Sequence, residues 1–223
     1  MLHFNLLIIR KIKLFGAVFK KYYQFANYQN MRNIAIFASG SGTNAENIIR
    51  YFSNKNSAKV SLVLSNKRQA MVLKRAEALN VTSVFFDQND FYGSEKVIRY
   101  LEKYEIDFIV LAGFLWLVPG ILIERYRGRI INIHPALLPS YGGKGMYGDA
   151  VHKAVIANHD PESGITIHFV NDRYDEGDII FQSRCKVDPE DTPESLAKKV
   201  HALEYAHFPE VIEKLILGEP VIR

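Results

Sequence analysis

Asn132 and His134 are the residues whose types and spacing point most directly to chemistry. They lie in Asn-Ile-His-Pro-Ala-Leu-Leu-Pro, residues 132–139, at the end of an apolar segment that predicts a strand. Side chains alternate along a strand, so both polar groups face one side and Ile133 faces the other. A carboxamide donates to a developing oxyanion, and an imidazole exchanges protons near neutral pH. The alternative is a structural histidine hydrogen-bonded in a turn.

The acidic loop 171–178 is a second candidate region, with the sequence Asn-Asp-Arg-Tyr-Asp-Glu-Gly-Asp. A carboxylate beside His134 would hold the ring and raise its pKa by stabilising the imidazolium. His134, His168 and an aspartate would also suit a metal, but no close histidine pair or cysteine ligand supports one, and we expect none. Acids in such a loop are also common turn formers. Chemistry alone leaves the acid undecided among Asp172, Asp175, Glu176 and Asp178.

A glycine loop, Ser-Gly-Ser-Gly-Thr-Asn at residues 39–44, separates the first predicted strand from the first predicted helix. Glycines let a ligand approach the backbone, and a helix N-terminus presents free N–H groups to an anion. The dinucleotide fingerprint would need a third glycine at Ala45 and an acid near residues 65–67, where the chain has Ser-Asn-Lys. The loop therefore favours a small phosphorylated substrate over NAD, with a plain tight turn as the alternative.

Helices and strands must position these residues. In the first half of the chain, segments that predict strands alternate with segments that predict helices. Continuous apolar strands predict a mostly parallel, twisted sheet with helices on both faces. Thr43 and Glu46 fit a capping box at the start of the first helix. We expect strands at 33–38, 60–64, 83–86, 108–112 and 129–133, and helices at 43–52, 70–79, 94–103 and from Pro119 toward Tyr126.

The pattern changes after residue 135. A loop rich in proline and glycine leads to a helix at 149–158, and two strands at 164–170 and 178–187 read as a hairpin. This C-terminal portion of the sheet is therefore expected to be antiparallel. A last helix begins at Thr192, with Pro193 in its first turn, and runs to about Leu217. Residues 31–223 are predicted to form one α/β domain.

Residues 1–30 carry much of the positive charge. The formal net charge is +4, but this segment holds five basic residues and no acid, so the remainder has 23 basic against 24 acidic residues. The near-neutral body gives no reason to expect a nucleic-acid partner. The short apolar runs of the segment are broken by cations, so no membrane span is expected. We interpret it as an extension, disordered or due to an upstream start codon, with Met31 as the start. The alternative is an ordered extension, such as a basic amphipathic helix that touches a membrane surface.

The single cysteine, Cys185, excludes an internal disulfide and a cysteine-based zinc site. It is expected to be a small core residue, and the composition suits a reducing cytoplasm. We expect small-molecule substrates and a monomer or homodimer.

The motifs together resemble the folate-dependent formyltransferase family. The resemblance covers residues 32–217 and is carried by the 132–139 stretch, by Leu-Ala-Gly-Phe at 111–114, and by His-Phe-Val at 168–170 followed by Tyr-Asp-x-Gly at 174–177. It is strongest to members that formylate 5-phosphoribosylglycinamide in purine biosynthesis, and it implies a Rossmann-like fold. Among the four acids it selects Asp175.

The resemblance also implies the reaction and the residues that serve it. The formyl group of 10-formyltetrahydrofolate would pass to the amine of 5-phosphoribosylglycinamide without a metal. Asn132 and protonated His134 would stabilise the oxyanion, and Asp175 would keep His134 charged. The substrate-binding residues would be Gly42, Thr43, Asn44 and Glu204. The folate-binding residues would be Leu115, Trp116, Leu117, Val118, Asn132 and Asn171.

Three departures from the family pattern concern individual contacts to the ligands and leave the proposed catalytic residues unchanged. Leu115-Trp116 replaces a common Met-Arg, the loop 141–148 is longer and richer in glycine, and His201 stands where glutamine is common.

Four other functions compete with this interpretation. A methionyl-tRNA formyltransferase would carry an additional C-terminal domain, and a formyltetrahydrofolate hydrolase an N-terminal one, for neither of which we expect room. A formyltransferase acting on an amino sugar nucleotide is a closer alternative. A non-catalytic module that binds a phosphate ligand is the alternative from another class.

Overall fold

The computed structural model describes residues 31–221. The expectations for residues 1–30 lie outside the described residues, and the division into an extension and a domain stays a prediction. The described elements are β1 (Arg32–Phe37), α2 (Thr43–Phe52), β2 (Ala58–Ser65), α3 (Met71–Ala78), β3 (Ser83–Phe85), η1 (Asn89–Gly93), α4 (Lys96–Lys103), β4 (Phe108–Leu111), α5 (Gly120–Arg125), β5 (Ile130–His134), α6 (Asp149–Ala157), β6 (Glu162–Phe169), β7 (Ile179–Lys186) and α7 (Pro193–Leu217).

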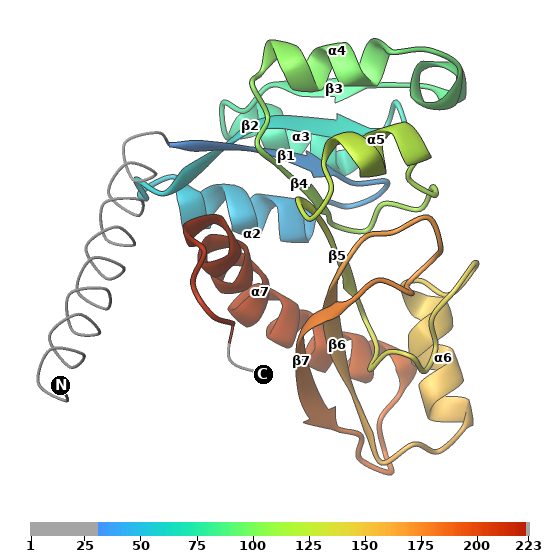
Figure 1. The fold of residues 1–223 in the computed structure, drawn as a ribbon. Helices are drawn as coiled ribbons and strands as arrows, with labels where there is room; N and C mark the ends of the chain where they lie inside the picture. The colour runs from blue at the N-terminus through green and yellow to red at the C-terminus, as the bar shows by residue number, and fades with distance from the viewer. Residues whose placement is uncertain (1–30, 222–223) are drawn as a thin grey trace, which may run out of the picture. The chain divides into compact units, whose positions relative to one another are not determined.

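One mixed sheet of seven strands organises residues 31–221, in the order β3-β2-β1-β4-β5-β6-β7 (Figure 1). The pairs from β3 to β5 are parallel, whereas β6 pairs antiparallel with β5 and with β7. The predicted α/β fold is therefore confirmed, including its antiparallel C-terminal portion. Because β1, β4 and β5 are parallel, their carboxyl ends meet at one edge, where open α/β sheets bind ligands.

Helices cover both faces of the sheet, since alternate side chains of the central strands enter two separate cores. Ile34 and Ile36 of β1 lie in one core with α2, α3, α6 and α7. Ala35 and Phe37 lie in the other with η1, α4 and α5. Figure 1 shows α2 and α7 on one side and α4 and α5 on the other. Burial on both faces explains why these strands read as continuous apolar runs.

The start of α2 corrects one prediction. Thr43 does not cap the helix, because the N-cap residue is Gly42, in the left-handed region at φ +75°. Glu46 instead pairs with Arg50 and Arg75. A Cβ on Gly42 would lie 2.4 Å from the Val72 side chain, so this turn requires glycine on two counts.

The start of α7 was predicted correctly. Thr192 caps the helix in a box with Ser195, and Pro193 occupies the first turn. The other predicted boundaries agree with the structure within a few residues. The π-helical turn η1 was not predicted. No helix among residues 31–221 is long and apolar enough to cross a membrane.

Candidate active site

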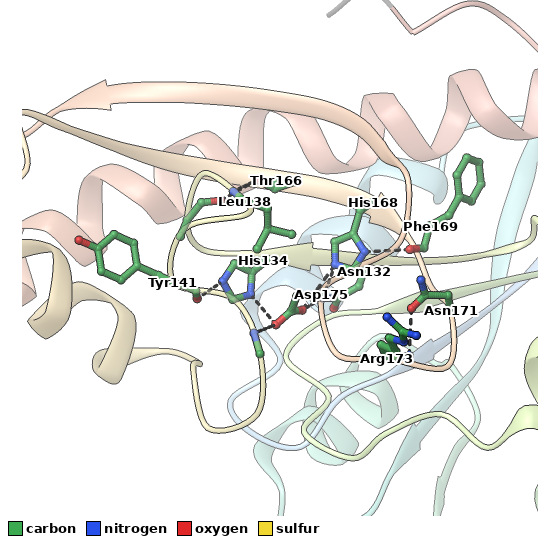
Figure 2. Close-up of polar contacts among 12 residues, drawn as sticks. Asn132, His134, Leu138, Tyr141, Thr166, His168, Phe169, Asn171, Arg173 and Asp175 are labelled. Atoms are coloured by element: carbon green, nitrogen blue, oxygen red, sulfur yellow. Dashed lines mark hydrogen bonds and ion pairs between the residues drawn. The ribbon is translucent and has the colours of Figure 1, made fainter.

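The strand β5 carries Asn132 and His134 to the carboxyl edge of the sheet, and the loop between β6 and β7 folds back over them (Figure 2). His134 is 3 % exposed. The Nδ1 atom of His134 lies 3.6 Å from Oδ2 of Asp175. The carboxamide nitrogen of Asn132 lies 3.4 Å from the other oxygen of Asp175. Three residues from two chain regions thus converge on one buried site.

Asp175 is the only one of the four candidate acids that the 171–178 loop turns inward. Asp172, Glu176 and Asp178 are exposed. Asp175 itself has a φ of +58°, which an aspartate adopts at some energetic cost, and its Oδ2 accepts a 2.9 Å hydrogen bond from the N–H of Gly143. A Cβ on Gly177 would lie 1.7 Å from the carbonyl oxygen of Phe169, so glycine is required where the loop packs against the end of β6.

The backbone of the following loop sets the orientation of the His134 ring. Its Nε2 lies 2.8 Å from the carbonyl oxygen of Tyr141, and a carbonyl only accepts, so Nε2 carries a proton. In the neutral ring the lone pair is therefore on Nδ1, which faces Asp175.

The loop itself is fastened to β6. The hydroxyl of Thr166 donates to the carbonyl of Ala136 and accepts from the N–H of Leu138, at 2.7 and 2.9 Å. These two hydrogen bonds hold the backbone after His134 against β6, the strand that also carries His168.

Burial lowers the pKa of His134 below its ordinary value, although the charge of Asp175 and the carbonyl of Tyr141 act to raise it. The carboxylate acts in the direction predicted from the sequence, but removing the imidazolium from water costs more here than the carboxylate returns, so the net pKa falls. For Asp175, burial acts to raise the pKa, but His168, His134 and the Gly143 N–H together lower it. In the free protein at neutral pH, the site therefore holds a carboxylate beside a neutral imidazole.

His168 is a site residue to which sequence reasoning gave no role beyond a rejected metal site. Its Nδ1 donates to the carbonyl of Phe169 at 2.8 Å, so in the neutral ring Nε2 accepts from the Asn132 amide at 3.1 Å. Asn132 and His168 are direct partners across the antiparallel β5–β6 pair. The pairing register was the signal that could have identified His168, but it depends on knowing that these strands are neighbours.

The predicted phosphate loop and Glu204 also come together, beside the catalytic candidates. Asn44 at the start of α2 donates to Glu204 of α7 at 2.8 Å, and His201 Nδ1 lies 2.8 Å from the same oxygen. Glu204 is buried, and the carbonyl oxygen of the Asn44 side chain is buried without a protein partner among the described residues. The negative charge of Glu204 is also close enough to act on the pKa of His134.

The predicted folate segment, residues 115–118, follows β4 at the same edge. The N–H of Leu115 donates to the Ser39 hydroxyl at 3.1 Å, which ties the segment to the glycine loop. Val118 is buried, whereas Leu115, Trp116 and Leu117 are half-buried and give the edge an apolar surface. The side chain of Asn171 forms a hydrogen bond within its own loop, because its oxygen accepts from the N–H of Arg173 at 3.0 Å.

Comparison with known proteins places this chain in a family. The formyl transferase family model matches residues 32–212. The chain belongs to the formyl transferase family. Phosphoribosylglycinamide formyltransferase of Bacillus subtilis is 36 % identical over 191 residues, which cover 83 % of this chain and 95 % of the relative. The chloroplastic enzyme of Arabidopsis thaliana is 40 % identical over 187 residues, 81 % of this chain, but the match spans only 64 % of the relative's length.

Solved structures of this formyl transferase family agree with the fold. The phosphoribosylglycinamide formyltransferase of Bacillus halodurans superposes with a TM-score of 0.74 at 36 % identity, covering 83 % of this chain and 95 % of that one. That of Anaplasma phagocytophilum gives 0.77 at 29 % identity, covering 84 % and 87 %. Among residues 31–221, no group of three or more histidine, cysteine or acidic side chains is arranged to hold a metal ion.

Proposed function

We propose that this formyl transferase moves the formyl group of 10-formyltetrahydrofolate to the amine of 5-phosphoribosylglycinamide, in de novo purine biosynthesis. The observation that carries the proposal is the contact of the buried His134 with Asp175 and of Asp175 with Asn132, beside the Asn44–Glu204 pair. The matched relatives named for this activity support it. The cytoplasmic location and the oligomeric state stay predictions.

The proposed role of His134 follows from its tautomer. The Tyr141 carbonyl keeps the proton on Nε2, so Nδ1 of the neutral ring is free to accept a proton. The substrate amine attacks the formyl carbon, forms the new C–N bond and leaves a tetrahedral intermediate with an oxyanion. Nδ1 then takes the proton released by the amine, either directly or through a water molecule. The imidazolium so formed is stabilised by Asp175, 3.6 Å away.

The second half of the reaction returns that proton. The bond between the formyl carbon and N10 of the folate breaks, and N10 receives the proton from His134, so that atoms and charges balance. Asn132 would support the oxyanion with an N–H. Its 3.4 Å contact with Asp175 is the longer of its two contacts and is the one we expect it to exchange.

Substrate binding divides between two sides of this site. We assign the phosphate to the N-terminus of α2 at Gly42, Thr43 and Asn44, where helix N–H groups favour an anion. Glu204 would hold the glycinamide portion, since its buried carboxylate is an acceptor for an amine or hydroxyl. The apolar segment 115–118, with Asn132 and the loop from Asn171 to Asp175, suits the flat pterin ring of the folate, and no resident cofactor is invoked.

A purified-protein assay tests the proposal. The expected result is loss of the formyl donor only when 10-formyltetrahydrofolate and 5-phosphoribosylglycinamide are both present. His134→Asn should reduce kcat by about 10²–10⁴, the range for a general acid–base residue. His159→Asn is the matched control, because His159 is exposed and asparagine tolerates its left-handed backbone.

The competing functions predict different outcomes. Donor loss without the amine would identify a hydrolase, and transfer only to an amino sugar nucleotide would identify the other formyltransferase. Phosphate-ligand binding that survives His134→Asn, with no turnover on any amine, would identify a binding module.

A further inference from the structure

Tyr92 is exposed at the carboxyl edge of the sheet and has no part in the chemistry above. It lies in η1, and 46 % of its surface is exposed. Its hydroxyl donates a 2.8 Å hydrogen bond to the carbonyl of Leu117. Its ring lies 5.9 Å from the ring of Trp116, at an interplanar angle of 33°. Tyr92 therefore contacts the 115–118 segment through both its hydroxyl and its ring.

The π-helical turn buries Asp90 and Phe91 and leaves this tyrosine exposed. Phe91 is buried among aromatic rings, with centroids 5.1 Å from Phe86 and 5.5 Å from Phe114. Asp90 fixes the turn from inside, because its carboxylate accepts from Lys96 at 2.9 Å and from the N–H of Asp87 at 3.2 Å. Phe91 is directed into the core, whereas the next residue, Tyr92, is exposed. Single π-helical turns often occur at functional sites.

The hydrogen bond has a structural consequence for residues 115–118, which belong to no helix or strand. Ser39 holds the N–H of Leu115 at one end, and Tyr92 holds the carbonyl of Leu117 near the other. The two hydrogen bonds together hold the segment near both of its ends.

We propose that Tyr92 is a positioning residue for the formyl donor: its hydroxyl fixes the backbone of residues 115–118, and its ring with Trp116 forms an aromatic surface for the folate. This inference rests on the proposed function. The flat rings of a folate suit such a surface, because offset stacking of aromatic rings is favourable. Tyr92 does not touch the phosphate loop in any contact of the described residues, so its effect should fall on the donor and not on the acceptor.

The test separates the hydroxyl from the ring. Tyr92→Phe removes only the hydrogen bond, and we expect the KM for 10-formyltetrahydrofolate to rise roughly 3- to 10-fold, the range for one net hydrogen bond. Tyr92→Leu removes the ring as well and should raise it further. The KM for 5-phosphoribosylglycinamide should stay within about twofold in both variants. Tyr104→Phe is the control, because Tyr104 ends α4 at the opposite edge of the sheet.

A binding readout makes the test independent of turnover. Trp116 is the single tryptophan of the chain, so its fluorescence reports on this surface. Tetrahydrofolate should quench this fluorescence, and free tryptophan amide corrects for the light that the folate absorbs. Tyr92→Leu should weaken the apparent affinity for tetrahydrofolate. Equal KM changes for both substrates, an unchanged donor KM in both variants, or no quenching in the wild type would overturn the inference. Quenching without formyl transfer would support the role of Tyr92 in folate binding and reject the proposed reaction instead.

Discussion

Replacing Asp175 by asparagine isolates the charge that faces His134. The substitution keeps the shape of the side chain and an oxygen able to accept from the Gly143 N–H, so the fold should persist. Two unit charges 3.6 Å apart attract by about 4.6 kcal/mol at an effective dielectric constant of about 20. Most of that attraction is available only after His134 gains its proton, that is, during the reaction.

The expected loss of rate follows from this magnitude. A barrier raised by about 3–5 kcal/mol corresponds to a fall in kcat of roughly 10²–10⁴, at about 1.36 kcal/mol per tenfold. The formyl-transfer assay at saturating substrates measures it. Asp172→Asn is the matched control, because Asp172 is exposed in the same loop, and its kcat should stay near that of the wild type.

A second measurement checks the electrostatic cause. Asp175 raises the pKa of His134 against the lowering effect of burial. Removing the carboxylate should therefore lower the pKa of His134 further, which an NMR titration of the imidazole signals would detect. A kcat within tenfold of the wild type, an equal fall in Asp172→Asn, or an unchanged His134 pKa would refute the reasoning.

Two further predictions concern the fold around the site. Gly42→Ala should lower the free energy of unfolding by about 1–3 kcal/mol through overpacking against Val72, seen in urea titration, and should raise the KM for the phosphorylated substrate more than that for the folate. A KM change shared equally by both substrates would count against a phosphate site at this turn. Burial and the neighbouring His201 lower the pKa of His152 below its unfolded value of 6.5, while Glu204 and Asp149 act to raise it. The unfolded ring takes up its proton first, so stability should be full above pH 6.5 and decline below it. His152→Gln should decline less between pH 7.5 and 5.5, and an identical decline would show that other groups cause it.

Local sequence patterns were sufficient for the fold and for part of the site. Strands that are buried on both faces of the sheet appear in the sequence as continuous apolar runs. Thr192 and Pro193 mark the start of α7. Alternation along β5 was enough to predict that Asn132 and His134 share a face, because their separation along the chain fixes it.

Contacts between distant segments decided the rest. The chemistry of the residues left four acids open, and only the family resemblance selected Asp175; the structure turns it inward through a loop that requires glycine at Gly177, against the end of β6. His168 joins the site only because β5 and β6 pair antiparallel. The direction of the His134 pKa could not be predicted either, since it is a balance between a visible charge and the desolvation imposed by elements that enclose the ring. Sequence thus determined which groups this chain offers, and tertiary packing decided their partners and their protonation.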